Sequence, residues 1–425
     1  MKLPLLILLM AYVLTQVVDY ALEILNLRYL RKYGQMEPEE FAGLIDADLL
    51  RRTEQYTMAH TRLGIVDDLC SEAATLIFIF SGLLFWYAGI VGQWQWPFVL
   101  SGLAFFLILE LVRALLDVPF DLFNTFRLEK RFGFNRMTPR IWLADQLKSR
   151  LLSMIISGLL LGGALWLYAV LPQWWWLAVW AFYLFFSVFM MYLAPYVLEP
   201  LFNKFTPIED DALVERVAAV LARAGIKVKG VFKMDASRRT SHTNAYFTGI
   251  GREKRIVLYD TLLQKLDTDE IVAVLAHEAG HCRHRHIIKM LLLFETGALM
   301  GAYLAFVFLG GDWLARLFGF PAGNLFTRVV LLGFAAAVVT WPLSPLFNWL
   351  SRRFEREADA FACEMVGDGG ALASALVKLS KDNLSNLHPH PCYAAFHYSH
   401  PPVIERIRYL QAWRRPPAAG EAITK

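Results

Sequence analysis

Residues 267–309 read DTDEIVAVLAHEAGHCRHRHIIKMLLLFETGALMGAYLAFVFL and join a chemical motif to a membrane-length apolar segment. The second half of this stretch is long and apolar enough to cross a bilayer as a helix. The first half holds two histidines, His277 and His281, four residues apart. Asp267 stands three residues before Glu270, an arrangement similar to the capping box that begins many helices. The stretch therefore predicts a polar helix with paired histidines directly before a transmembrane helix.

The composition also indicates a membrane protein. Of the 425 residues, 56% are hydrophobic and 19% are charged, and the mean hydropathy is +0.40. A soluble domain usually carries about 25% charged and 45–50% apolar residues. These values exclude a disordered, collagenous or disulfide-framework protein and argue against a soluble enzyme. The net charge of +4 is ordinary and gives no reason to expect a nucleic-acid partner.

Seven apolar runs predict seven transmembrane helices of about 16–25 residues each. Trp and Tyr residues mark several of their ends, where amphipathic rings favour the membrane interface. No small-residue cleavage site follows the first run, so we expect an uncleaved anchor. The runs are Leu3–Val18, Ala73–Val91, Pro97–Leu116, Leu151–Leu171, Trp175–Val197, Ile287–Leu309 and Phe326–Leu350.

Basic residues are distributed unevenly between the two sides of this predicted bundle. The connections on one side hold 37 of the 42 Lys and Arg residues, and those on the other side hold two. The positive-inside rule places the basic side in the cytoplasm. We therefore expect a multi-pass membrane protein with a cytoplasmic C-terminus and an external N-terminus, located in the inner membrane if the source is bacterial.

The spans divide the chain into four parts. Residues 1–198 are expected to hold five transmembrane helices, and residues 199–286 a soluble insert that ends in the histidine helix. Residues 287–350 are expected to hold transmembrane helices six and seven, and residues 351–425 a cytoplasmic C-terminal segment.

The insert has its own pattern of elements. Helical periodicity over Asp210–Ala224 stops at Gly225, which predicts one helix. Three short apolar or alternating runs, separated by Gly and basic turns, predict strands of a small antiparallel sheet: Gly230–Met234, Asn244–Ile250 and Arg255–Asp260.

The histidine helix carries the candidate chemistry. The spacing of His277 and His281 places both imidazoles on one face, where they can bind a single zinc ion, with Glu278 beside the metal as general base. A catalytic zinc site needs a third protein ligand and keeps a fourth position for water. Glu355 is the best candidate, and Asp359, one turn later on the same face, can accept the second N–H of a ligating histidine.

These patterns have alternatives. The two histidines could lie on an ordinary surface helix, although the apolar residues before them indicate partial burial. Glu355 and Asp359 could be a solvated pair on a charged helix beside the membrane. Within the predicted third span, Glu110 and Arg113 either pair with each other or face a wet interior.

Six segments between Phe120 and about Leu410 carry a resemblance to a known family. They are Arg131–Thr138 (RFGFNRMT), Pro200–Pro207 (PLFNKFTP), Ser241–Phe247 (SHTNAYF), His277–His281 (HEAGH), Ser351–Phe361 (SRRFEREADAF) and Tyr398–Arg406 (YSHPPVIER). On these segments the chain resembles the CAAX prenyl protease 1 family, which consists of seven-span zinc metalloendopeptidases.

The resemblance implies a mainly α, polytopic membrane fold. Seven transmembrane helices would surround a water-filled chamber, with a zincin-like α+β catalytic insert on the cytoplasmic side. The resemblance also implies one Zn²⁺ ion bound by His277, His281 and Glu355, with Glu278 as the catalytic base and Asp359 orienting a histidine ligand.

Three further residues match positions that act on the substrate in the family. Asn244 lies in a strand that would line the cleft and pair with an extended peptide, which fits recognition by strand addition. His400 and Arg406 would assist near the scissile carbonyl.

Some neighbouring residues are expected to have no part in the metal site. His284 and His286 alternate with Arg283 and Arg285, which favours a basic cluster at the membrane edge. Glu357 stands where relatives often have Gln, on the helix face turned away from the proposed metal.

The main hypothesis is therefore an integral membrane zinc endopeptidase, which the resemblance associates with the C-terminal CAAX sequences of prenylated proteins. The alternatives are a quality-control protease for membrane proteins without prenyl specificity, and a non-catalytic membrane scaffold on the same fold. A channel or transporter would leave the histidine motif unexplained and lacks visible repeat symmetry. The expected partners are a peptide or protein substrate in extended form, with or without a prenyl group, and the lipid bilayer.

Overall fold

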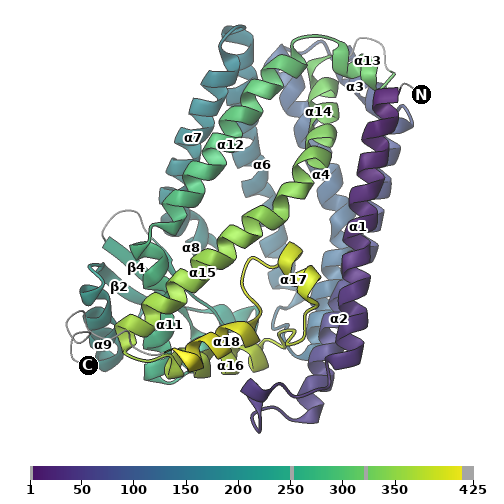
Figure 1. Ribbon diagram of the computed structural model, residues 1–425. Coiled ribbons are helices and arrows are strands. Elements are labelled where there is room, and N and C mark those ends of the chain that lie inside the picture. Colours follow the sequence, from purple (N-terminus) through teal and green to yellow (C-terminus); the bar gives the residue numbers. More distant parts are fainter. Residues whose placement is uncertain (1–2, 249–252, 320–323, 414–425) are drawn as a thin grey trace, which may run out of the picture.

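Long helices dominate the structure, a computed structural model that describes residues 3–248, 253–319 and 324–413 (Figure 1). Among the described residues, six helical segments are long and apolar enough to cross a bilayer, and a bent pair of helices can form a seventh span. A polytopic, mainly helical membrane fold is thus confirmed. The six segments are built on α1 (Leu3–Tyr33), α4 (Phe98–Phe123), α6 (Pro139–Val170), α7 (Trp175–Leu193), α12 (His286–Leu309), and α14 (Leu325–Thr340) with α15 (Ser344–Val366).

The second predicted span, Ala73–Val91, is not one straight helix. α2 (Ala47–Phe80) and α3 (Leu83–Gln93) meet at an angle of 64°. Gly82 between them has a φ of 91°, a left-handed conformation that interrupts the helix and that glycine adopts without steric cost. A single continuous helix over Ala73–Val91 is therefore wrong, although the bent pair can still form one span, because an apolar composition does not reveal a bend.

The last span continues past its predicted end at Leu350. A 3₁₀ turn at Trp341–Leu343 separates α14 from α15, and α15 then runs without a break to Val366. Glu355 and Asp359 consequently stand on a rigid extension of a membrane helix.

Four strands form a small mixed sheet in the order β1-β2-β4-β3. β2 (Lys227–Met234) and β4 (Glu253–Tyr259) run parallel, whereas β1 (Phe205–Pro207) and β3 (Ala245–Thr248) pair antiparallel with β2 and β4 respectively. The predicted antiparallel sheet is therefore wrong for β2 and β4. After β2 the chain first forms β3, which lies on the far side of β4, and only then forms β4 between β2 and β3. Because of this crossover, β2 and β4 run in the same direction. β3 is an edge strand, and Gly249 and Ile250 of its predicted range lie outside the described residues.

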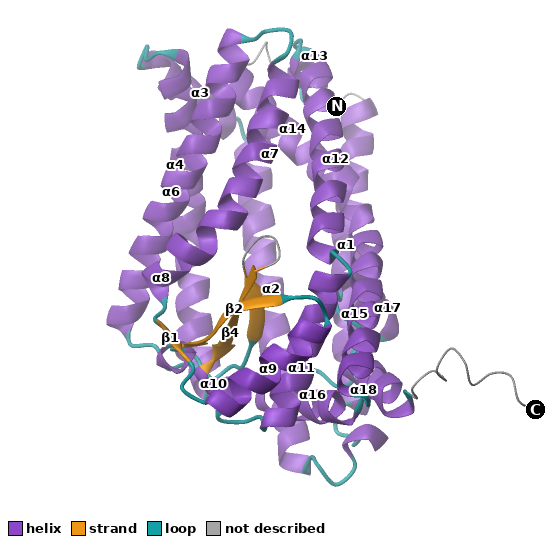
Figure 2. Cartoon of the chain, turned by 90° about the vertical axis from the view of Figure 1, so that its left-hand side faces the viewer, coloured by secondary structure: helices purple, strands orange, loops and turns teal. Residues whose placement is uncertain are grey.

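Helices of the insert and of the C-terminal segment gather with the sheet at one end of the long helices (Figure 2). α9 (Asp211–Arg223) begins after the cap residue Asp210, as predicted. α11 (Thr268–Arg283) begins with the predicted capping box, in which the side chains of Asp267 and Glu270 bind each other's backbone N–H. A buried apolar cluster joins the sheet to α9, α11, α15 and α16 (Gly370–Asp382).

The remaining elements are short or lie in the C-terminal segment. They are α5 (Lys130–Phe132), α8 (Glu199–Phe202), α10 (Asp260–Leu263), α13 (Trp313–Leu317), α16 (Gly370–Asp382), α17 (Pro391–His397), α18 (Val403–Ala412) and the 3₁₀ or π-helical turns Glu39–Phe41, Asn124–Glu129, Ala194–Leu198 and Ala236–Arg238.

The membrane-length helices bury little of their apolar windows inside the protein, between 0 and 17%. Such low burial fits helices that contact lipid on one side and an open interior on the other. Glu110 accepts a hydrogen bond from Ser153 Oγ at 2.5 Å, and none of the ion pairs in the described part of the chain joins it to Arg113. The alternative of a simple Glu110–Arg113 pair is therefore wrong.

Candidate metal centre

Close packing of α11 on α15 determines the position of the candidate metal ligands. α11 is buried along most of its length. A Cβ atom on Gly280 would lie 2.8 Å from Ala358 Cα, so only glycine permits the observed approach of the two helices. This approach brings His277 and His281 on α11 to Glu355 on α15.

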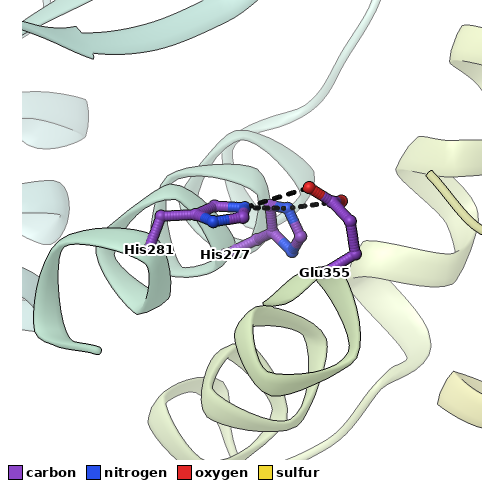
Figure 3. A group of neighbouring side chains, drawn as sticks. All are labelled: His277, His281 and Glu355. Atoms are coloured by element: carbon purple, nitrogen blue, oxygen red, sulfur yellow. Dashed lines mark hydrogen bonds and ion pairs between the residues drawn. The ribbon is translucent and has the colours of Figure 1, made fainter. Parts of the chain in front are cut away.

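The two imidazoles and the carboxylate converge on one point (Figure 3). The Nε2 atoms of His277 and His281 are 3.3 Å apart. Glu355 Oε2 lies 3.5 Å from Nε2 of His277, and Glu355 Oε1 lies 3.3 Å from Nε2 of His281. Among the described residues, these three form the group of ligand-type side chains whose ligand atoms all lie within 4.8 Å of one another.

The spacing of these atoms fits a tetrahedral zinc ion. With metal–ligand bonds of about 2.0–2.2 Å, two ligand atoms of a tetrahedral zinc lie about 3.3–3.6 Å apart. The separation of the two Nε2 atoms falls in this range, and each Nε2 atom has one oxygen of the Glu355 carboxylate at a distance in the same range. Glu355 Oε2 is buried without a hydrogen-bond partner in the described part of the chain, as expected for an oxygen that a cation satisfies. Two imidazoles and one carboxylate are also a known donor set of catalytic zinc sites.

Gly280→Ala is expected to weaken metal binding and to destabilise the fold. The added methyl group would push α15 away from α11, and such overpacking costs about 1–3 kcal/mol. Metal content and thermal unfolding of the purified variant measure both effects. Gly297→Ala on α12 is the matched control, because a Cβ there would meet no atom within 4 Å. Identical behaviour of the two variants would contradict the role given to Gly280.

Asp359 supports His277 on the Nδ1 side of its ring, and Arg406 in turn holds Asp359. Asp359 Oδ1 accepts a hydrogen bond from Nδ1–H of His277 at 2.8 Å, which leaves Nε2 free for a metal. Arg406 donates to both oxygens of Asp359, from Nε at 2.9 Å and from Nη2 at 2.6 Å. Burial alone would lower the pKa of Arg406, but the carboxylates of Asp359 and Glu355 raise it, so this guanidinium stays charged.

Glu278 and His400 complete the surroundings of the cluster. Glu278 directly follows His277 and is half-buried. Burial raises the pKa of Glu278, which moves this carboxylate towards the basicity that a general base needs near neutral pH. Nε2 of His400 lies 3.3 Å from Glu355 Oε1, while 62% of the His400 side chain remains exposed. The His400 ring therefore stands beside the cluster on a side that a substrate can reach.

Asn244 lies at the sheet and not among these residues. It is exposed directly before β3, its carbonyl oxygen accepts from the backbone N–H of Tyr259 at 3.1 Å, and its Oδ1 accepts from Ala245 N–H at 2.8 Å. These bonds hold the start of β3, which packs on α11. Asn244 therefore marks the beginning of the sheet edge next to the histidine helix.

His286 contacts a residue of the cluster, a contact that the sequence did not predict. Its ring is 3% exposed, and its Nδ1 lies 3.0 Å from Nδ1 of His281. The predicted basic cluster at the membrane edge is therefore wrong for this residue. Because α11 ends at Arg283 and Arg285 has a left-handed φ of 55°, helical periodicity could not have placed His286.

Comparison with known proteins agrees with this architecture. Residues 26–204 match the family description "CAAX prenyl protease N-terminal, five membrane helices", and residues 207–414 match "Peptidase family M48". The CAAX prenyl protease 1 homolog of Arabidopsis thaliana is 33% identical over 388 residues, which cover 88% of this chain and 90% of that protein. CAAX prenyl protease 1 of Saccharomyces cerevisiae is 32% identical over 396 residues and 86% of each chain.

The chain belongs to peptidase family M48. The crystal structure of S. mikatae Ste24p superposes with a TM-score of 0.88 and 29% sequence identity, covering 96% of this chain and 99% of that one. Membership in family M48 makes the chain a metalloendopeptidase and implies a bound metal ion. The match to five membrane helices and the membrane-length helices of the structure make it a multi-pass membrane protein. The main functional hypothesis drawn from the sequence is thereby confirmed at the level of the enzyme class.

Proposed function

We propose that the chain binds one Zn²⁺ ion through His277, His281 and Glu355 and uses Glu278 as the catalytic base. The convergence of the three ligand side chains, with separations of 3.3–3.5 Å that suit a tetrahedral ion, carries this proposal. The burial that raises the pKa of Glu278 supports its role as base.

The surrounding residues have separate tasks in peptide hydrolysis. When bound, zinc supplies Lewis-acid chemistry, which polarises a peptide carbonyl and lowers the pKa of a coordinated water towards about 7. Glu278 takes a proton from the attacking water and passes it to the leaving amine. His400 donates a hydrogen bond to the oxygen of the scissile carbonyl, where negative charge develops. Asp359, held by Arg406, keeps the His277 ring in the orientation that directs Nε2 to the metal.

The substrate we propose is an extended peptide from the C-terminal region of a membrane-associated protein. Asn244 directly precedes β3, which packs on α11. Among the described strands none pairs with the outer edge of β3, and this edge offers backbone groups for strand addition. The relatives named CAAX prenyl proteases favour a prenylated cysteine in this peptide. The distribution of 37 of the 42 basic residues supports a cytoplasmic location of the site.

Detergent-purified protein is expected to contain one zinc ion per chain and to cleave a farnesylated peptide that ends in a CAAX sequence. Chelation should abolish cleavage, and added zinc should restore it. The same peptide with an unmodified cysteine is the matched substrate. Equal cleavage of both peptides would overturn prenyl specificity, and a zinc-loaded protein that cleaves neither would overturn the proposed activity on such sequences in favour of a scaffold.

A further inference from the structure

We propose that His286 and Glu357 form a hydrogen-bonded pair that positions the metal ligand His281. The inference rests on the zinc site proposed above and adds two positioning residues to it. Neither residue contacts the three converging ligand atoms, and each acts through the ring of His281.

The contacts form a continuous chain. Nδ1 of His281 lies 3.0 Å from Nδ1 of His286. Nε2 of His286 lies 3.0 Å from Glu357 Oε2. Arg353 donates from Nε to the other carboxylate oxygen, Glu357 Oε1, at 3.2 Å, so the carboxylate is held with Oε2 towards His286.

The hydrogen atoms can be assigned along this chain without conflict. A histidine that binds zinc through Nε2 carries its proton on Nδ1, so His281 donates from Nδ1–H. Nδ1 of His286 then accepts this bond, and Nε2–H of the same ring donates to Glu357. Both rings are neutral, every buried nitrogen has one role, and Nε2 of His281 keeps its lone pair for the metal.

The ring of His286 is fixed by packing as well as by hydrogen bonds. It is 3% exposed and stacks on Phe354, with ring centroids 4.1 Å apart and planes 8° from parallel. Arg285 adopts φ 55° and ψ 37° directly before it, a left-handed conformation that is unfavourable for a residue other than glycine. The chain thus tolerates local strain at the point where α12 begins and His286 turns back to His281.

The arrangement parallels the support of the other histidine ligand. Nδ1–H of His277 donates directly to a buried carboxylate, Asp359. His281 lacks a carboxylate at this position, and the imidazole of His286 spans the gap to Glu357. Outer groups of this kind fix the orientation of a ligand ring, and their loss commonly lowers metal affinity 10- to 100-fold. Because His286 is the first residue of α12, the contact also ties the metal ligand to a membrane helix.

The test is zinc affinity, measured by chelator competition on the detergent-purified full chain, together with thermal unfolding of the zinc-free protein. His286→Phe keeps an aromatic ring against Phe354 but removes both hydrogen bonds. We expect it to weaken zinc binding 10- to 100-fold without changing zinc-free unfolding. His284→Phe, two residues away on the turn between α11 and α12, is the matched control and should bind zinc as the wild type does.

Glu357→Gln should weaken zinc binding in the same direction, and the double variant should behave as His286→Phe alone, because both substitutions break one chain of contacts. Wild-type zinc affinity in His286→Phe would overturn the inference. If His286→Phe does not fold, Glu357→Gln decides: weaker zinc binding supports the pair, and unchanged binding overturns it. A wild-type chain that binds no zinc would instead refute the proposed metal site.

Discussion

Glu278→Gln is expected to lower kcat/KM for peptide cleavage by about 10²–10⁴-fold while one zinc ion per chain is retained. Glutamine has nearly the same shape as glutamate but cannot take a proton from water. Glu278 is not among the three converging ligands, so the metal affinity should not fall. The loss should appear in kcat, because the proton is transferred in the chemical step and not when the substrate binds.

The measurement compares steady-state cleavage and zinc content of the wild type and the variant. Asp269→Asn is the matched control, since Asp269 is an exposed carboxylate near the opposite end of α11, paired with Arg216 at the surface. This control should cleave normally. Cleavage within a few-fold of the wild type in Glu278→Gln would show that another group acts as the base.

The sequence predicted those features that depend on neighbouring residues. The cap of α11, the start of α9 and the apolar spans follow from local propensity and hydropathy, and the structure confirms them. The spacing of His277 and His281 likewise fixes their common face. The choice of Glu355 rested on a resemblance and on its i,i+4 relation to Asp359, and both residues do lie at the histidines.

Features that depend on distant packing were missed. The parallel pairing of β2 with β4 arises from the crossover through β3, which no local pattern records. The bend at Gly82 depends on one backbone angle within an apolar run. His286 reaches His281 only because Arg285 takes a left-handed conformation between two helices. In the last two cases a single non-periodic backbone conformation redirects the chain, and in the first the pairing depends on the order of the strands in the sheet. Periodicity carries no information on either.

Glu355→Gln is expected to remove zinc from the purified protein and to reduce cleavage on the order of 10³-fold or more, since a metal contributes several kcal/mol to such a reaction. A neutral amide oxygen is a much weaker zinc ligand than a carboxylate. The substitution also removes the negative charge that faces Nη1 of Arg406 at 3.5 Å and Nε2 of His400 at 3.3 Å. The Arg406 cation and the His400 hydrogen-bond donor would then face the cation site without the negative charge of Glu355 between them.

The expected signature differs from that of Glu278→Gln. Excess zinc should partly restore cleavage in Glu355→Gln, because the defect lies in metal affinity, whereas it should not help a chain that lacks the base. Glu364→Gln is the matched control, as Glu364 is an exposed carboxylate on the same helix, α15. One tightly bound zinc ion in Glu355→Gln would contradict the assigned third ligand. Because α15 continues the last membrane span, loss of zinc only in the Glu355 variant would establish that a membrane helix itself supplies the third metal ligand.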